Sequence, residues 1–201
     1  MNEHDSWDQR YASMEQVWSG QPNGALVSET TGLHSGNALD VGCGEGADAI
    51  WLAEHGWDVT ALDVSEVALE RAARHAEHAQ VGVRWVHAGL VEASLPPGTF
   101  HLVSAQYPAL LRSDDHDAER ALLGAVAPGG TLLVVHHVNI DAEQARAHGF
   151  DPDDYVSPSD VAAQLDGKWR IEINETRPRH VTAGAGSHHA HDVVLRARRL
   201  N

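Results

Sequence analysis

The sequence predicts an α/β domain with a doubly wound, mainly parallel sheet and helices on both faces. Two observations predict it: strand-like apolar runs alternate with helical patterns from about Asn37 onward, and the tail holds two strand-like runs with no long helix between them. At 201 residues, the chain is long enough for one well-filled domain. We expect residues 1–36 to form an N-terminal helical cap or lid, and residues 37–201 to form the core of this compact domain.

Predicted strands and helices alternate through the core up to residue 135. Its first helix ends at Gly56, its second is capped by Ser65, and its third is stopped by the Pro-Gly-Gly stretch at 128–130. Such alternation predicts parallel strands covered by helices on both sides. The predicted strands cover 38–41, 57–62, 83–86, 102–104 and 131–135, and the predicted helices cover 47–55, 67–75 and 118–126.

The tail departs from this alternation. Residues 169–174 and 192–197 read as strands, and the stretch 182–187 between them has the composition of a loop. Two strands joined without a crossover helix are expected to be antiparallel. A parallel sheet closed by a hairpin is therefore predicted.

The charge balance limits the class of partner. The chain has 14 Lys and Arg against 29 Asp and Glu, a formal net charge of −15. Nucleic acids and anionic membranes require a basic surface, so we expect neither as a partner. The single cysteine, Cys43, excludes an intramolecular disulfide, and with the polar, acidic N-terminus it favours the cytoplasm. The oligomeric state does not follow from the sequence.

A glycine-rich turn follows the first predicted strand, in the stretch Asp40-Val-Gly-Cys-Gly-Glu-Gly46. A strand, a glycine turn and a helix bring a ligand close to the backbone. Gly42, Gly44 and Ala47 also satisfy the dinucleotide pattern G-x-G-x-x-A, so the spacing alone does not identify the ligand.

The charges around this turn separate the two kinds of ligand. Asp40, Glu45 and Asp48 would face a bound pyrophosphate, and the turn contains no Lys or Arg. Like charges repel in a partly buried site, so the turn favours a cationic ligand over a dianion. Asp63, at the end of the second strand, is placed to accept hydrogen bonds from ribose hydroxyls with either ligand.

Residues 38–53 resemble the first motif of the class I S-adenosylmethionine-dependent methyltransferases, and 57–65 resemble their second strand with its acidic end. The segments 7–11 and 18–23 resemble the tellurite-resistance and thiopurine methyltransferase branch. Together the similarity spans most of residues 6–138. It implies a Rossmann-like sheet of seven strands whose last strand is antiparallel. It also implies S-adenosylmethionine as the cofactor and methyl transfer to a small-molecule nucleophile, such as an oxyanion or a sulfur or selenium atom.

The same resemblance assigns roles around the turn. Gly42 and Gly44 would line the methionine part of the cofactor, and Asp40 would hold its ammonium group. Asp63 would bridge the ribose hydroxyls, and Val64 would pack on the adenine.

Two further stretches are assigned by the resemblance. In the family, an acid usually follows the third strand and bonds the adenine amino group, but this chain has Gly89 at that position and departs from the pattern there. The backbone N–H of Leu90 remains available to the ring. Gln106 and Tyr107, just past the fourth strand, would lie beside the sulfonium and the acceptor.

Histidines gather at the same predicted edge of the sheet. Ligands of open α/β sheets bind beyond the carboxyl ends of the parallel strands, where an antiparallel strand begins. We expect this edge to collect His136, His137, His180, His188, His189 and His191. Three interpretations compete: solvated edge residues, an acceptor-binding or proton-accepting role centred on His136 and His137, and a metal or metalloid site. No metal ligand is assigned.

Three aromatic residues, Trp7, Tyr11 and Trp18, precede the core and either cover the active site as a lid or simply pack against the sheet. Two other functions remain open. One is an NAD-binding oxidoreductase, which the loop acids and the short chain disfavour. The other is a non-catalytic cofactor- or metal-binding regulator on the same fold.

Overall fold

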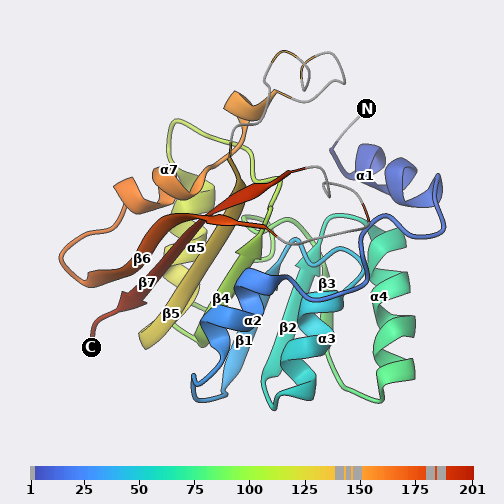
Figure 1. Ribbon diagram of the computed structural model, residues 1–201, viewed down its shortest axis with the longest axis horizontal. Helices are drawn as coiled ribbons and strands as arrows, with labels where there is room; N and C mark the ends of the chain where they lie inside the picture. The colour runs from blue at the N-terminus through green and yellow to red at the C-terminus, as the bar shows by residue number, and fades with distance from the viewer. Residues whose placement is uncertain (1–2, 139–142, 144–145, 147–150, 180–183, 185–188) are drawn as a thin grey trace.

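The computed structural model describes residues 3–138, 143, 146, 151–179, 184 and 189–201. One sheet of seven strands runs through it in the order β3-β2-β1-β4-β5-β7-β6 (Figure 1). The strands are β1 (Asn37–Val41), β2 (Asp58–Asp63), β3 (Arg84–His87), β4 (Phe100–Gln106), β5 (Val126–His137), β6 (Trp169–Pro178) and β7 (His191–Arg199). The helices are α1 (Glu3–Ala12), α2 (Gly24–Thr30), α3 (Ala47–Glu54), α4 (Glu66–Ala79), α5 (Asp117–Ala125) and α7 (Pro158–Ala163), with a 3₁₀ turn at Pro152–Asp154.

Strand directions confirm the predicted sheet. The pairs among β1 to β5 are parallel, whereas β7 is antiparallel to both β5 and β6. One boundary differs from the prediction, because β5 begins at Val126 and not at 131. Helix α5 ends directly at this strand, where Val126 pairs with Phe100 across a register shift. Gly129, at φ +72°, accommodates the irregular backbone.

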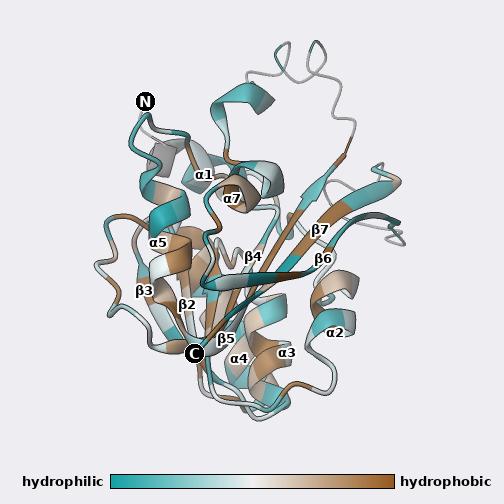
Figure 2. Ribbon diagram, turned by 90° about the vertical axis from the view of Figure 1, so that its left-hand side faces the viewer, coloured by the Kyte–Doolittle hydropathy of each residue, from teal (hydrophilic) through white to brown (hydrophobic). Residues whose placement is uncertain are grey.

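Two apolar layers cover the sheet, one on each face (Figure 2). Leu39 and Val41 of β1 pack in a cluster with Leu122 of α5 and Val161 of α7. Ala38 belongs to the opposite cluster, together with residues of α2 and α3 such as Leu26 and Leu52. Alternate residues of a strand point to opposite faces, so burial on both faces explains the nearly continuous apolar runs of the sequence.

The first 36 residues are attached to the core at both of their helices. Helix α1 lies beside the start of α4 (Figure 1), where the Asp8 carboxylate accepts hydrogen bonds from the Ser65 hydroxyl at 2.6 Å and the Val67 N–H at 3.3 Å. Glu29 of α2 forms ion pairs with Arg177 of β6 and Arg196 of β7. These contacts join the beginning of the chain to its last two strands.

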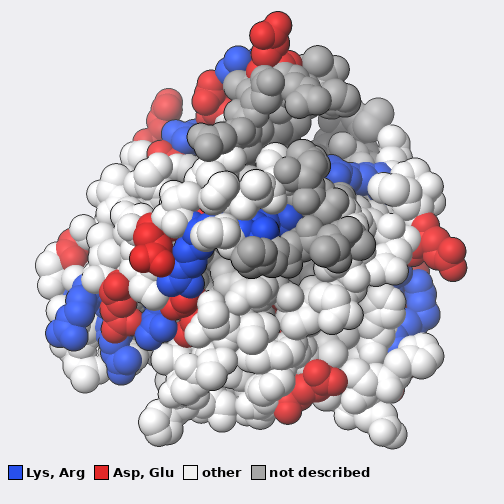
Figure 3. All heavy atoms as spheres, in the orientation of Figure 1, with Lys and Arg blue, Asp and Glu red and all other residues white. Residues whose placement is uncertain are grey.

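Charged side chains of both signs lie side by side over β6 on the face shown in Figure 3. Arg196 pairs there with Glu172 at 3.0 Å, and Arg177 pairs with Glu175 at 2.6 Å. Charged side chains on an edge strand oppose pairing with other chains. Among the described residues, no helix has the length and apolar character needed to cross a membrane.

Candidate functional site

The turn after β1 depends on three glycines with positive φ. Gly42, Gly44 and Gly46 have φ values of 69°, 51° and 85°, a region that residues with a side chain rarely adopt. The N–H groups of Gly42 and Cys43 donate to the Leu62 carbonyl at 2.9 and 3.0 Å, which ties the turn to β2. The turn is therefore a backbone cradle at the carboxyl edge of the sheet, as the sequence predicts.

Asp63 links this cradle to the start of α4. Its carboxylate accepts the Gly44 N–H at 2.8 Å and the Ser65 N–H at 2.9 Å. Burial raises the pKa of Asp63, while these N–H groups act in the opposite direction. The remaining lone pairs of its oxygens are available to hydroxyl donors.

Two buried oxygens beside the cradle have no hydrogen-bond partner among the described residues: Asp40 Oδ2 and Gln106 Oε1. Asp40 lies on β1 opposite Ser104 of β4, two residues before Gln106. Burial, followed by the charges of Asp48 and Asp63, raises the pKa of Asp40 well above its ordinary value. An unpaired buried acceptor is costly, so this pair of oxygens fits a ligand that carries N–H donors and a positive charge.

Glu45 and Asp48, which the sequence analysis expected to face a ligand, are paired with other parts of the chain. Glu45 accepts hydrogen bonds from the N–H groups of Val17 and Trp18 and forms an ion pair with Arg71 at 2.9 Å. Asp48 accepts two hydrogen bonds from Asn23, each at 2.7 Å. The sequence pattern missed these contacts because the partners lie about 25 residues away. Of the three acids, Asp40 alone keeps an oxygen that has no partner within the described residues.

Two aromatic residues of the N-terminal segment lie directly against the cradle. A Cβ atom on Gly44 would lie 2.8 Å from the Tyr11 hydroxyl and 3.0 Å from Trp18 Nε1. These two groups are hydrogen-bonded to each other at 2.7 Å. Glycine at position 44 thus permits the close approach of the aromatic pair as well as the turn itself.

A carboxylate stands at the expected adenine side although position 89 is glycine. A Cβ atom on Gly89 would collide with the Glu92 carboxylate, and Val64 Cγ1 lies 3.7 Å from the same point. The Ala93 N–H donates a hydrogen bond to the Gly89 carbonyl and closes a short turn. This turn brings Glu92 back over the glycine. Leu90 is buried. The Glu92 carboxylate therefore lies beside the position at which the resemblance expects an acid.

The second half of the site lies at the ends of β4 and β5 and contains a cluster around Asp192. His137 Nδ1 lies 3.0 Å from Asp192 Oδ1, and the Tyr107 hydroxyl donates to Asp192 Oδ2 at 2.6 Å. Arg179 Nε lies 3.6 Å from the same carboxylate and donates to the Tyr107 oxygen at 3.1 Å. The ring of His137 stacks between Tyr107 and His189, with centroid separations of 4.2 and 4.0 Å.

The remaining histidines of the predicted group have different surroundings. His136 lies edge-on to His137, and burial together with His137 lowers its pKa to about 4. His191 is exposed on β7. His180 and His188 lie outside the described residues. Within the described part of the chain, no three His, Cys, Asp or Glu side chains are arranged to hold a metal ion.

Cys43 is a buried free thiol within the glycine turn. Burial, and then the charges of Asp63 and Asp40, raises its pKa well above the ordinary value. The thiolate is the nucleophilic form of cysteine, so this environment suits a small packing residue and opposes a nucleophile.

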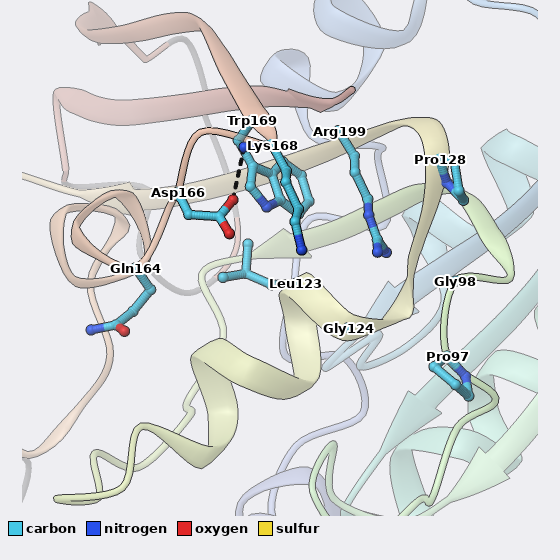
Figure 4. Close-up of a pocket in the computed structure, with 10 residues that line it drawn as sticks. All are labelled: Pro97, Gly98, Leu123, Gly124, Pro128, Gln164, Asp166, Lys168, Trp169 and Arg199. Atoms are coloured by element: carbon cyan, nitrogen blue, oxygen red, sulfur yellow. Dashed lines mark hydrogen bonds between the residues drawn. The ribbon is translucent and has the colours of Figure 1, made fainter. Parts of the chain in front are cut away.

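A cavity of about 590 Å³ lies at the opposite end of the sheet. Figure 4 shows Lys168, Trp169 and Arg199 around it, near the start of β6 and the end of β7. These positions are on the amino edge of the parallel strands, away from the cradle and from the Asp192 cluster. The cavity has no part in the site described above.

Sequence reasoning missed three residues of the site: Glu92, Arg179 and Asp192. Asp192 was expected only as the first residue of a strand, although an acid beside His191 at the start of an apolar run was a visible signal. His137 and Asp192 face each other across β5 and β7, a register that becomes visible only once the hairpin is placed.

Comparison with known proteins identifies the family. A family model described as a methyltransferase domain matches residues 38–130. The uncharacterized methyltransferase Rv0089 of Mycobacterium tuberculosis is 36% identical over 157 residues, which cover 78% of this chain and 77% of that protein. A solved structure from work on conversion of a disulfide bond into a thioacetal group in echinomycin biosynthesis matches at 25% identity with a TM-score of 0.78, covering 99% of this chain and 93% of that one. The N-methyltransferase NodS from Bradyrhizobium japonicum matches in fold, at 18% identity with a TM-score of 0.72, over the whole of both chains. The cradle at 42–46 thus lies in a chain that belongs to the methyltransferase family.

Proposed function

We propose that this protein transfers a methyl group from S-adenosylmethionine to a small-molecule nucleophile. The observation that carries the proposal is a pair of buried oxygens beside a glycine cradle, Asp40 Oδ2 and Gln106 Oε1, which have no partner in the part of the chain that the structure describes. An α-ammonium group supplies the N–H donors and the positive charge that these oxygens lack. The NodS structure was solved in complex with S-adenosyl-L-homocysteine, and its fold agrees with this chain.

The residues present fit the cofactor along the whole cradle. Asp40 would hold the ammonium group, and Gly42 and Gly44 would face the methionine part. Asp63 would accept hydrogen bonds from the ribose hydroxyls.

On the adenine side, Val64 and the N–H of Leu90 would contact the ring. The Glu92 carboxylate, which stands over Gly89, would accept the hydrogen bond of the adenine amino group.

When bound, S-adenosylmethionine supplies a methyl group on a positively charged sulfur. The contribution of the chain is to hold an acceptor in line with that methyl group. Tyr107, His136 and His137 follow β4 or end β5 at the carboxyl edge, so they would line the acceptor side. Gln106 would lie between the cofactor side and the acceptor side of the site.

A small-molecule acceptor fits the charge of the chain, since a net charge of −15 opposes nucleic acids and anionic membranes. The resemblance of the N-terminal segment to the tellurite-resistance and thiopurine branch favours oxyanions or soft sulfur and selenium atoms as acceptors. Tyr11 and Trp18 would close over the methionine part, so the N-terminal cap would act as a lid. A cytoplasmic location accords with the single, protonated cysteine.

Isothermal titration of the full chain with S-adenosylmethionine, S-adenosylhomocysteine and NAD tests the proposal. We expect micromolar binding of both adenosyl ligands, no binding of NAD, and loss of binding in Asp63→Ala. Asp58→Ala is the matched control, because Asp58 is an exposed acid at the far end of the same strand. Binding of NAD alone would favour the oxidoreductase alternative, and adenosyl binding without turnover of any acceptor would favour a regulator.

A further inference from the structure

A buried carboxylate joins the ends of four strands at the acceptor side. Asp192 is 6% exposed and interacts with His137, Tyr107 and Arg179. Tyr107 follows β4, His137 ends β5, Arg179 follows β6, and Asp192 is the second residue of β7. Parallel strands end, and the antiparallel strand begins, at the same edge of the sheet, which explains why residues so far apart in sequence meet there.

The backbone at Tyr107 is held in an unfavourable conformation at this point. Its φ is +53°, a region that costs a bulky residue about 1–3 kcal/mol. In this conformation the Tyr107 N–H donates to the Val135 carbonyl at 2.8 Å, and the phenol reaches Asp192. Backbone strain of this kind gathers at functional sites, where the surrounding structure maintains it.

We propose that Asp192 positions His137 as a general base, and that the acceptor is a neutral nucleophile carrying an acidic hydrogen, such as a thiol or a phenol. This inference rests on the proposed methyl transfer. An ionised carboxylate only accepts hydrogen bonds, so His137 Nδ1 must carry the ring proton. The lone pair is then on Nε2, the nitrogen that remains for the acceptor.

The neighbours of Asp192 support this division of roles. Arg179, whose side chain is 8% exposed, supplies a positive charge beside the carboxylate. Tyr107 donates its proton to Asp192, and burial, followed by Asp192 itself, raises the pKa of the phenol. Tyr107 is therefore a positioning donor and not the base. The stacked rings of Tyr107 and His189 fix the plane of His137 from both sides.

The proposed step balances as a displacement at carbon. The acceptor X–H gives its proton to His137 Nε2, and the electron pair of X forms the bond to the methyl carbon. The bond between methyl and sulfur breaks, and its electron pair remains on the sulfur, which gives S-adenosylhomocysteine. Asp192 stabilises the imidazolium of His137, which afterwards releases its proton to water.

The first arm of the test reads the position of the ring proton by ¹⁵N NMR of the histidines in the full chain. We expect the Nδ1–H tautomer at His137 in the wild type, and its loss in Asp192→Ala. His55 is an internal reference, because its Nδ1 lies 2.7 Å from the Trp51 carbonyl and must also carry the proton. An Nε2–H tautomer at His137 in the wild type would overturn the positioning role, whether or not the variant folds.

The second arm measures S-adenosylhomocysteine formation with four probe acceptors: 2-mercaptoethanol, catechol, tellurite and dimethyl sulfide. We expect turnover only of 2-mercaptoethanol and catechol, in which the nucleophilic atom itself carries the acidic hydrogen. In Asp192→Asn, kcat should fall by about 100-fold or more, with a smaller change in KM. Asp166→Asn, which alters an exposed acid at the other end of the sheet, should leave kcat unchanged.

Each outcome of this second arm decides between the two proposals. Three outcomes would overturn the role of His137 as a base and the proposed acceptor class. The first is turnover confined to tellurite or dimethyl sulfide, and the second is an unchanged kcat in Asp192→Asn. The third is turnover of none of the four probes by protein that binds S-adenosylhomocysteine. Loss of S-adenosylhomocysteine binding itself would instead overturn the proposed function, and the tautomer of His137 would still report on Asp192.

Discussion

Two buried aspartates at the same edge of the sheet have opposite surroundings. Asp40, beside the glycine cradle, has one oxygen with no partner among the residues that the structure describes, and burial raises the pKa of its carboxyl group. Asp192, at the start of β7, interacts with a histidine, a tyrosine and an arginine. An unpaired buried acid is a binding group for a cation, whereas a fully paired one orients its neighbours. Under the proposed function, the cofactor completes the contacts of Asp40, whereas Asp192 is already paired before an acceptor binds.

The largest effect should come from removing the charge of Asp40. We expect Asp40→Asn to weaken S-adenosylhomocysteine binding about 100-fold, near 3 kcal/mol, because a buried ammonium loses its carboxylate partner. The ligand-free protein should unfold at the same or a higher temperature, because the raised pKa shows that the buried carboxylate is unfavourable. Titration calorimetry and thermal unfolding measure the two quantities. A variant that binds normally would contradict the role of Asp40.

The pH dependence of binding checks the same residue in the wild type. A cation beside Asp40 favours the ionised carboxyl, so binding below the raised pKa must release a proton. Affinity should rise with pH from the ordinary range of an aspartate up to that raised value and then level off. Titrations in buffers of different ionisation enthalpy count the protons directly, and Asp40→Asn should release fewer.

At the acceptor half, the pKa of His136 predicts acid sensitivity of the fold. Burial and His137 lower this pKa to about 4 from 6.5, so the unfolded chain binds a proton that the folded chain does not. Folding stability should therefore fall as the pH drops from 6.5 to about 4, by up to about 3 kcal/mol. Urea unfolding across this range measures the loss. His136→Gln should show a shallower pH dependence, and an equal slope would contradict the assignment.

An added methyl group at Gly44 should disturb the packing of Tyr11 and Trp18 against the cradle. Gly44→Ala places a Cβ atom 2.8 Å from the Tyr11 hydroxyl at a φ of +51°, so we expect about 1–3 kcal/mol of lost stability. Tryptophan fluorescence should also change as Trp18 moves. Gly82→Ala is the control, because no atom lies within 4 Å of its added Cβ. Equal unfolding free energies for the two variants would show that the aromatic pair does not press on the turn.

The smallest effect concerns the adenine side. Glu92→Gln should weaken S-adenosylhomocysteine binding about fivefold, near 1 kcal/mol, through the loss of one charge-assisted hydrogen bond. S-inosylhomocysteine, which lacks the 6-amino group, should bind the wild type and the variant with similar affinity. Glu77→Gln, at an exposed position on α4, is the matched control. The same fivefold loss with both ligands would remove Glu92 from adenine recognition.

The sequence predicted the glycine turn and the acids beside it, because these residues are close together in the chain. The cradle, Asp40 and Asp63 lie within 24 residues, and local patterns of strand, glycine and acid identify them. The hairpin and the convergence of His136, His137 and His189 were also predictable, because strand direction determines which ends meet. Asp192 as a partner of His137 was not, because a shift of one residue in register turns a side chain to the other face of the sheet.

The contacts of Glu45 and Asp48, beside the cradle, also could not be predicted from the sequence. Their charge was visible in the sequence, but their partners come from backbone and side-chain groups of the N-terminal segment. A loop composition shows which charges are present and does not show which of them are already neutralised. The Glu29 pairs with β6 and β7 were hidden for the same reason.

The attachment of the N-terminal segment to Glu45 and Asp48 makes it part of the same cooperative unit as the cradle. The amides of Val17, Trp18 and Asn23 donate to these carboxylates, so we expect them to exchange with solvent only when the acids move away. Opening of the loop and release of the segment should then be one event with one free energy. We expect a ligand that stabilises the cradle to slow hydrogen exchange at Val17 and Asn23, about 25 positions earlier in the chain.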